Sequence, residues 1–436
     1  MNRQASIETL APNKRRGAAL IVMMFVVVLA STAIFITLLA KTNPEIERQK
    51  KTIAALVQAK QALIAWSVTR GDMQPATTTA TTTDPTTGAQ TTTTSYTYYR
   101  PGSLPCPDTN YFGTGNSGFS AGSCSSSGGT SIGRLPWKSL RTEKLLDASG
   151  EPLWYAISDN FRRANGLNDR AINSDTKGSL LLYGTDGTTL VTPAGEELAA
   201  IVFSPGPPLS GQDRVTLPNA AKSYLDAFNG KDNANAAGPF IVGPIRDSNG
   251  NLISNDMVIG ISAKELIAAV ELRALKEAQN ALLVYSATKG KYPNPARYNG
   301  TNCASIVTDV TAASIPLCAS DQATCIGRLP EDVLEVLVAP WFKQNGWGRT
   351  MTYAIKDNAA NCSTQIKVDG IEKSYVLIAP GVARAGQARP PPSTQQNLPS
   401  SLSNYLEDAG NKDAWTGNTD FVTPTSASND HLRSAP

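Results

Sequence analysis

The sequence predicts an α+β protein in which one small helix-and-sheet unit occurs twice. Helix-forming segments with apolar residues every three or four positions precede short β-branched runs bounded by glycine and proline. Seven short motifs also occur twice, in the same order, roughly 200 residues apart. A repeat of that length has the size of a domain, so we expect two similar heads in tandem, each a helix on a small antiparallel sheet.

The repeated motifs contain residues typical of turns, such as Gly, Pro and Asn, and residues typical of a core, such as Tyr, Leu and Ile. They are Ala-x-x-Ala-Leu at 59–63 and 278–282, Pro-x-Pro at 105–107 and 293–295, Gly-Arg-Leu-Pro at 133–136 and 327–330, Tyr-Ala-Ile-x-Asp-Asn at 155–160 and 353–358, Pro-Gly at 205–206 and 380–381 with Gly-Gln-x-Arg at 211–214 and 386–389, Tyr-Leu-Asp/Glu at 224–226 and 405–407, and Ser-Asn-Asp at 254–256 and 428–430. One interpretation is a ligand surface bearing Arg134 and Arg328. We favour the other, an internal scaffold in which arginine caps carbonyl groups and tyrosine packs in the core, because tandem heads need the same scaffold.

Within each head, the pattern predicts the elements in order. Helix 263–287 should open the second head, as the end of the N-terminal helix opens the first. Strands are expected at 180–183, 189–191 and 199–203, with a turn at Asp186-Gly187, and at 375–379 in the second head. The Thr-rich stretch 74–97 has too few apolar residues for a core, so we expect a loop there.

The N-terminal segment is a basic cluster followed by an apolar run. Lys-Arg-Arg at 14–16 precedes Gly17, and residues 18–40 carry no charge. A helix of that length spans about 34 Å, enough for a bilayer core of ~30 Å. The basic cluster predicts a cytoplasmic N-terminus and export of the chain beyond residue 41. Because helix formers continue past Pro44, we expect one long helix, with its transmembrane half at 18–40 and its exported half at 41–73.

This arrangement resembles the type IV pilin and type II secretion pseudopilin family. The resemblance implies a leader at 1–17, cleavage by prepilin peptidase after Gly17, Ala18 as the first mature residue, open to methylation, and a helix bend at Pro44. The chain departs from the family at Val22, the fifth mature position, where most pilins carry Glu to pair with a neighbouring subunit. Minor K-type subunits lack this Glu and are proposed to sit at the fibre tip.

Two other interpretations of the N-terminus remain open. A plain signal anchor also has basic residues before an apolar run, and the protein would then begin at Met1. A cleaved secretory signal would use the small residues near Ala30, and the protein would begin near Ala33. The helical pattern that continues beyond residue 41 favours the pilin-like interpretation.

The charge balance and the cysteines narrow the possible partners and the cellular compartment. The leader holds four basic residues and one acidic residue, so 35 basic and 35 acidic residues remain of the 39 and 36 in the chain. This balance argues against nucleic acid as a main partner. The six cysteines lie beyond the predicted export point, where disulfides form. Spacing predicts the pairs Cys106–Cys124 and Cys303–Cys318, which leaves Cys325–Cys362; the competing zinc interpretation lacks a C-x₂₋₄-C pair.

Several local patterns imitate catalytic or metal sites. Residues 113–118 fit G-x-G-x-x-G and residues 118–122 fit G-x-S-x-G, but neither has the required strand-to-helix context. The single histidine, His431, lies near the C-terminus, where we do not expect it to be held rigidly. Asp247, Asn249 and Asn251 are a weak calcium candidate, and Asn249-Gly250 fits a hairpin turn better. We therefore expect no catalytic residue and no cofactor, with calcium as the one open alternative.

These observations predict a structural minor pilin or pseudopilin rather than an enzyme. The first head would span 98–262 and the second 263–436, both on the periplasmic side of the inner membrane and, after assembly, in a fibre that reaches the cell surface. Its partners would be other pilin-type subunits, prepilin peptidase and the inner membrane. The alternative is a surface adhesin, which uses the heads to bind a glycan or another partner.

Overall fold

The structure is a computed structural model, which describes residues 44–70, 76–83, 87–97, 100–110, 113–122, 124, 130–162, 171–193, 195–296, 326–356, 365–389, 404–412 and 420–435. Its contacts divide the chain into two compact units, 1–54 and 55–436. The second unit holds both heads, which we name the first head (98–262) and the second head (263–436). The fold is α+β, with several small sheets.

The expected long transmembrane helix is wrong. Helix α2 runs from Pro44–Thr69, and among the described residues no helix is both long and apolar enough to cross a membrane. Helix α2 is described from Pro44 onward, so the predicted bend at Pro44 stays a prediction that involves residues outside the described part of the chain. The buried side chains of α2 include Leu56, Ala59 and Leu63, which belong to a protein core. Residues 18–40 lie outside the described part of the chain.

The first head is built on a four-stranded antiparallel sheet in the order β12-β6-β4-β3. Its elements are β3 (Thr130–Arg134), α3 (Trp137–Leu140), β4 (Trp154–Ser158), η2 (Asp159–Phe161), β5 (Leu182–Tyr183), β6 (Leu198–Ser204), η3 (Ala221–Ser223), β7 (Ala227–Phe228), β8 (Lys231–Asp232), β9 (Phe240–Ile241), β10 (Ile245–Arg246), β11 (Leu252–Ser254) and β12 (Met257–Ser262). The expected strand at 199–203 is confirmed within β6. Around 189–191, a single bridge between Tyr183 and Leu190 replaces the expected strand.

The second head repeats this sheet in the order β13-β14-β17-β19, again antiparallel throughout. Its elements are α4 (Ala263–Lys289), β13 (Ile326–Arg328), α5 (Pro340–Gln344), α6 (Trp347–Thr350), β14 (Thr352–Ile355), β15 (Ile366–Val368), β16 (Ile371–Lys373), β17 (Tyr375–Ala379), α7 (Ala409–Lys412), β18 (Asp420–Phe421) and β19 (His431–Ala435). The predicted helix at 263–287 and strand at 375–379 are confirmed. Strands β3, β4, β6 and β12 therefore correspond, in chain order, to β13, β14, β17 and β19.

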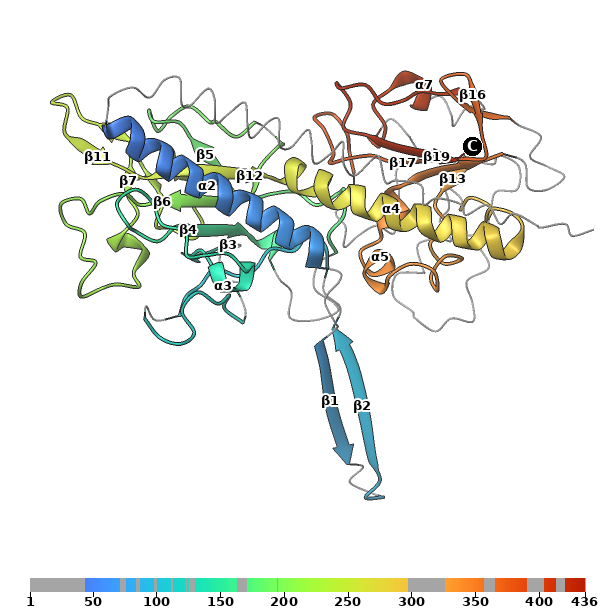
Figure 1. Ribbon diagram of the computed structural model, residues 1–436, viewed down its shortest axis with the longest axis horizontal. Helices are drawn as coiled ribbons and strands as arrows, with labels where there is room; N and C mark the ends of the chain where they lie inside the picture. The colour runs from blue at the N-terminus through green and yellow to red at the C-terminus, as the bar shows by residue number, and fades with distance from the viewer. Residues whose placement is uncertain are drawn as a thin grey trace, which may run out of the picture. The chain divides into compact units, whose positions relative to one another are not determined.

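Both faces of each sheet are covered, as the strand alternation requires. In β4, Tyr155 and Ile157 join a core that runs through both heads, whereas Trp154 and Ala156 join a separate cluster on the other face. Strand β17 alternates in the same way between the shared core and a cluster of the second head. Helix α4 contributes to the shared core and contacts strands of both sheets (Figure 1).

Helix α4 begins where a local signal places it. The Ser262 side chain accepts a hydrogen bond from the backbone N–H of Glu265, 3.0 Å away, which caps the first turn. Gly290 ends the helix in the left-handed conformation, with φ 68°. This start coincides with the first residue of the second head.

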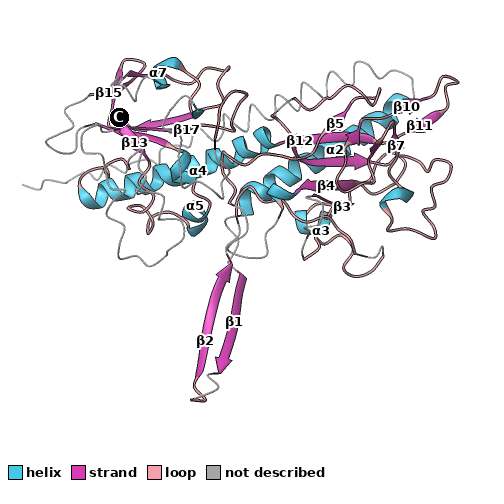
Figure 2. Ribbon diagram, turned by 180° about the vertical axis from the view of Figure 1, so that it is seen from behind, coloured by secondary structure: helices cyan, strands magenta, loops and turns pink. Residues whose placement is uncertain are grey.

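The Thr-rich stretch differs from the expected loop. It forms an antiparallel hairpin of β1 (Ala76–Thr83) and β2 (Gln90–Thr97), drawn as a separate pair of strands in Figure 2. Threonine is β-branched and has high strand propensity, and the two Thr runs can pair in register across a turn. Low complexity argued against a core but did not exclude local strand pairing.

Candidate functional site

The Gly-Arg-Leu-Pro motifs serve as internal scaffold in both heads. The backbone of Arg134 exchanges two hydrogen bonds with Asp108, of 2.8 and 3.0 Å, and Arg328 does the same with Ala296, at 2.8 Å each. A Cβ on Gly133 would lie 2.8 Å from the Asp108 carbonyl oxygen and 2.9 Å from Pro107. The motif thus needs glycine because the segment after each Pro-x-Pro crosses directly above it.

Arg134 and Arg328 do not form a ligand surface. Their side chains are buried, at 5% and 7% exposure. The Arg134 guanidinium lies 3.6 Å from the Asp108 carboxylate and donates to the Asn219 side-chain oxygen at 2.7 Å and to the Asn110 carbonyl. This arginine therefore ties three segments of the first head together.

The Gly-Gln-x-Arg and Tyr-Leu-Asp/Glu motifs build one network, which occurs in both heads. Arg214 donates to the Gly206 carbonyl at 2.8 Å and to the Gln212 side chain at 2.7 Å, while its guanidinium stacks 4.8 Å from the Tyr224 ring centroid. Gln212 in turn donates to Asp226 at 2.8 Å. The second head repeats these contacts. Arg389 donates to the Gly381 carbonyl at 2.6 Å and to the Gln387 side chain at 2.8 Å, and its guanidinium lies 4.8 Å from the Tyr405 ring centroid. Gln387 donates to Glu407 at 2.9 Å. The repeated residues therefore join the Pro-Gly segment to the Tyr-Leu-Asp/Glu segment in each head.

Each network ends in a pair of carboxyl groups. The Asp256 side chain accepts from the Asp226 backbone N–H at 2.7 Å, and Asp430 accepts from the Glu407 N–H at 3.0 Å. Burial, with the neighbouring Asp226 carboxylate as a second cause, raises the pKa of Asp256 well above its usual range. Burial likewise raises the pKa of Asp430 to about 8, and Glu407 adds to it. At neutral pH, such pairs are expected to retain a proton.

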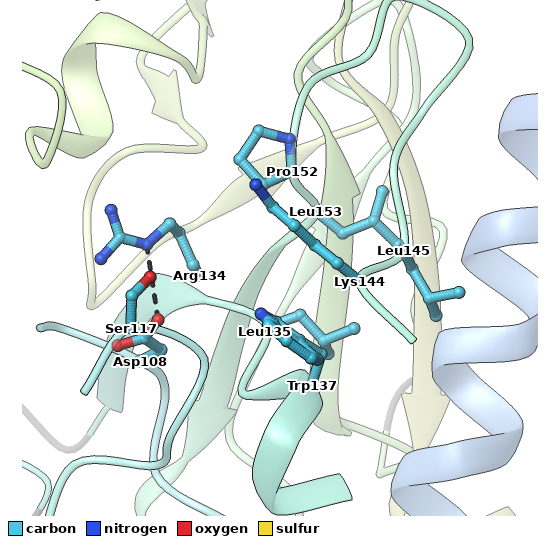
Figure 3. Close-up of a pocket in the computed structure, with 9 residues that line it drawn as sticks. All are labelled: Asp108, Ser117, Arg134, Leu135, Trp137, Lys144, Leu145, Pro152 and Leu153. Carbon is cyan, nitrogen blue, oxygen red and sulfur yellow. Dashed lines mark ion pairs between the residues drawn. The ribbon is translucent and has the colours of Figure 1, made fainter. Parts of the chain in front are cut away.

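A recess in the first head lies beside the Arg134–Asp108 ion pair (Figure 3). Its lining is mainly apolar and includes Leu135, Trp137, Leu145, Pro152 and Leu153, together with Lys144. Its free volume is ≈ 10 Å³, which suits about one water molecule. The recess is therefore too small for a substrate or cofactor.

The predicted disulfide Cys106–Cys124 is present, with a Cα–Cα distance of 5.5 Å. The other cysteines, Cys303, Cys318, Cys325 and Cys362, lie outside the described residues, as do Gly17, Ala18 and Val22. Those assignments stay predictions.

The calcium candidate is a tight turn between β10 and β11. One oxygen of Asp247 accepts from the backbone N–H groups of Asn249 and Asn251 at 2.9 and 2.7 Å, and the other accepts from the Asn251 side chain at 2.9 Å. These hydrogen bonds lower the pKa of Asp247. Because donors from the turn already occupy both oxygens, the geometry is that of the hairpin turn.

Residues 113–122, which carry both glycine patterns, form a loop of turns and bends after the first Pro-x-Pro, without the strand-to-helix geometry of a dinucleotide site or a nucleophile elbow. Among the residues that the structure describes, no group of three His, Cys, Asp or Glu side chains is placed to hold a metal ion.

His431 is held more firmly than expected. Its Nδ1 lies 2.7 Å from the carboxylate of Glu271, which is fully buried in α4. Glu271 also accepts from the Ser174 hydroxyl and from the Gly381 N–H, at 3.0 Å for the latter. The Ser174 hydroxyl faces the carboxylate rather than the imidazole, so this cluster is a junction between the heads and not a nucleophile with its base.

Sequence reasoning missed this junction, although one signal pointed to it. Glu271 lies four residues after Ile267 and four before Leu275, in the buried stripe of α4. An acidic residue in an apolar stripe predicts a buried partner. The partners, Ser174, Gly381 and His431, carry no comparable signal.

The chain matches no protein-family model, no curated protein and no solved structure. The functional argument therefore depends on the residues alone.

Proposed function

We propose that the chain is a structural minor subunit of a pilin-like fibre, of the type IV pilus or type II secretion kind. The observation that supports this most is a unit that occurs twice, a four-stranded antiparallel sheet with helical residues packed against one face. A basic segment that ends in Gly17 precedes the first unit. The heads would lie on the periplasmic side of the inner membrane, and Val22 at the fifth mature position favours a place at the fibre tip.

The role of the repeated residues supports a structural, non-enzymatic function. The two arginine networks and the glycine crossings are used inside the fold, and the recess beside Arg134 suits a single water. Other pilin-type subunits and prepilin peptidase would be the partners.

The N-terminus of the protein, purified from its own cells, tests this proposal. We expect a first residue of Ala18 when prepilin peptidase is present and an uncleaved chain when it is absent. Gly17→Glu should block cleavage, whereas Gly115→Glu, at an exposed loop glycine with nothing near its Cβ position, should not. A start at Met1 in both strains, or near Ala33, would contradict the proposal.

Fibre incorporation gives a second, separate readout. Val22→Glu restores the residue that most pilins carry, so we expect that variant to be processed normally and to enter the interior of the fibre. Complete loss of membrane insertion or processing in that variant would count against the pilin pathway.

A further inference from the structure

In the first head, Phe119 and Trp137 lie on either side of Lys138, and two exposed basic residues, Arg141 and Lys144, follow within six positions along the chain. We name these five residues the aromatic–basic patch. The Lys138 ammonium lies 5.0 Å from the centroid of the Phe119 ring and 5.3 Å from that of Trp137. Phe119 is 47% exposed, an unusual position for a phenyl ring. The patch thus brings two aromatic rings and a cation together, with the Phe119 ring exposed and Trp137 and Lys138 half-buried.

The segment that carries Phe119 is held in place from several sides. The Cys106–Cys124 disulfide closes it, and Asp108 accepts from the Gly118 N–H at 2.7 Å. The Asn110 side chain donates to the Phe119 carbonyl at 3.1 Å, and the Ser139 hydroxyl accepts from the Ser120 N–H at 2.8 Å. A ring that is already ordered loses little conformational entropy when it binds a partner.

Packing also holds the Trp137 side of the patch. A Cβ on Gly118 would lie 2.5 Å from the Trp137 indole nitrogen, so the indole lies against the glycine backbone. Arg141 ends α3 with φ 58°, a left-handed conformation that would suit glycine better than arginine. Arg141 is an exposed residue at this end of α3.

The duplication shows that the fold does not require this patch. The Gly-Arg-Leu-Pro motif is shared, but the next two residues are Trp137 and Lys138 in the first head and Glu331 and Asp332 in the second. Glu331 pairs with Arg349 at 2.8 Å, and Asp332 with Lys343 at 3.0 Å. The same scaffold therefore carries opposite charge in the two heads.

Charge and shape together indicate the ligand. Residues 137–145 contain three basic residues, Lys138, Arg141 and Lys144, and one acidic residue, Glu143. This excess of positive charge favours an anionic ligand. The recess beside it has room for about one water, too little for the side chain of a peptide. An exposed aromatic ring such as that of Phe119 suits a sugar ring, whose C–H groups stack on its face.

We propose that the aromatic–basic patch binds an acidic polysaccharide, a chain of sugar rings bearing carboxylate or phosphate groups. This site goes beyond the proposed structural role and does not depend on it. It would give the first head an adhesive function that the second head lacks.

Binding of polygalacturonate to the full-length protein tests this proposal, with neutral dextran and poly-glutamate as comparison ligands. We expect polygalacturonate to bind, binding to weaken with added salt, and dextran and poly-glutamate to bind at least about 10-fold more weakly. Phe119→Ala and Lys138→Gln should each weaken binding about 10-fold, and Phe119→Tyr should retain it. Val215→Ala, at another exposed apolar side chain of the same head, is the matched control and should leave binding unchanged.

Three results would overturn the proposal: no binding of polygalacturonate, equal binding by Phe119→Ala and the parent protein, or poly-glutamate bound as tightly as the polysaccharide. The last would identify a peptide surface. The melting temperature of each variant shows that it remains folded, which is expected because Phe119 is half exposed. N-terminal processing in Phe119→Ala should be normal, so failure here is distinct from failure of the pilin proposal.

Discussion

Asp175 of the first head and Arg389 of the second form an ion pair, with 3.7 Å between Oδ1 and Nη1, and neither side chain is exposed to solvent. Asp175 belongs to a buried segment, 172–176, whose polar groups contact the second head. Asn173 donates to the Asn345 carbonyl at 2.7 Å, and the Asn345 side chain accepts from the Ile172 N–H at 2.9 Å. The heads are therefore joined by specific, solvent-excluded contacts as well as by chain connectivity.

Asp175→Asn should strongly destabilise the protein. The substitution keeps the size of the side chain but leaves the Arg389 charge buried without its carboxylate, which typically costs about 3 kcal/mol or more. The free energy of unfolding in urea measures this loss. Glu372→Gln is the control, because it breaks an exposed pair with Lys356 of 3.0 Å and should cost below about 1 kcal/mol. Equal effects of the two substitutions would show that the buried pair does not stabilise the junction.

The contacts at this junction could not be predicted from the sequence. Periodicity predicts α4 and β17 because each pattern lies within one segment, and the spacing of Cys106 and Cys124 relative to the repeated motifs predicts their bridge. The contacts of Asp175, Asn345 and Glu271 join segments far apart in the chain, and no local pattern reports such pairs.

The errors at the N-terminal side have a common cause. Helix propensity after Pro44 predicted the exported half of a transmembrane helix, yet the same pattern fits helix α2, whose Leu56, Ala59 and Leu63 belong to a protein core. Low complexity predicted a loop at 74–97, yet threonine pairs well in strands. Both patterns fit two structures, and the sequence contains no observation that separates them.

Stability should fall as the pH rises from about 4 to 8 because of Asp430. Its pKa is about 8 in the folded head and near 4 when unfolded, so in this interval the folded state holds a proton that the unfolded state has released. The contribution of Asp430 to the free energy of unfolding is then largest at the acidic end and decreases by at most about 1.4 kcal/mol per pH unit. Urea unfolding at pH 5 and 8 gives the slope.

Asp430→Asn should reduce that slope, since the amide does not titrate. Asp247→Asn is the control: hydrogen bonds in its turn lower the pKa of Asp247 in the folded state, so between pH 5 and 8 its carboxyl is almost fully ionised in both states. An unchanged slope in Asp430→Asn would show that the buried carboxyl pair does not control the pH dependence.

Gly133→Ala should destabilise the first head through a backbone clash. The added methyl group would lie 2.8 Å from the Asp108 carbonyl oxygen, so strand β3 must move away from the crossing segment, at a cost of about 1–3 kcal/mol. Thermal unfolding measures the loss. Gly115→Ala adds the same group to open space without a positive φ and should leave the melting temperature nearly unchanged. If both variants melt alike, the crossing segment adapts freely, and close approach does not explain the repeated glycine.

Removal of the Cys106–Cys124 bridge should affect both stability and the aromatic–basic patch. The bridge closes a loop with a sequence separation of 18, for which chain entropy predicts about 3 kcal/mol. The double substitution Cys106→Ser with Cys124→Ser should lower the free energy of unfolding by about that amount. Because the loop carries Phe119, polygalacturonate should also bind more weakly at temperatures where the protein remains folded. If the stability falls while binding is unchanged, the hydrogen bonds from Asp108 and Asn110 suffice to hold Phe119, and the bridge stabilises the fold alone.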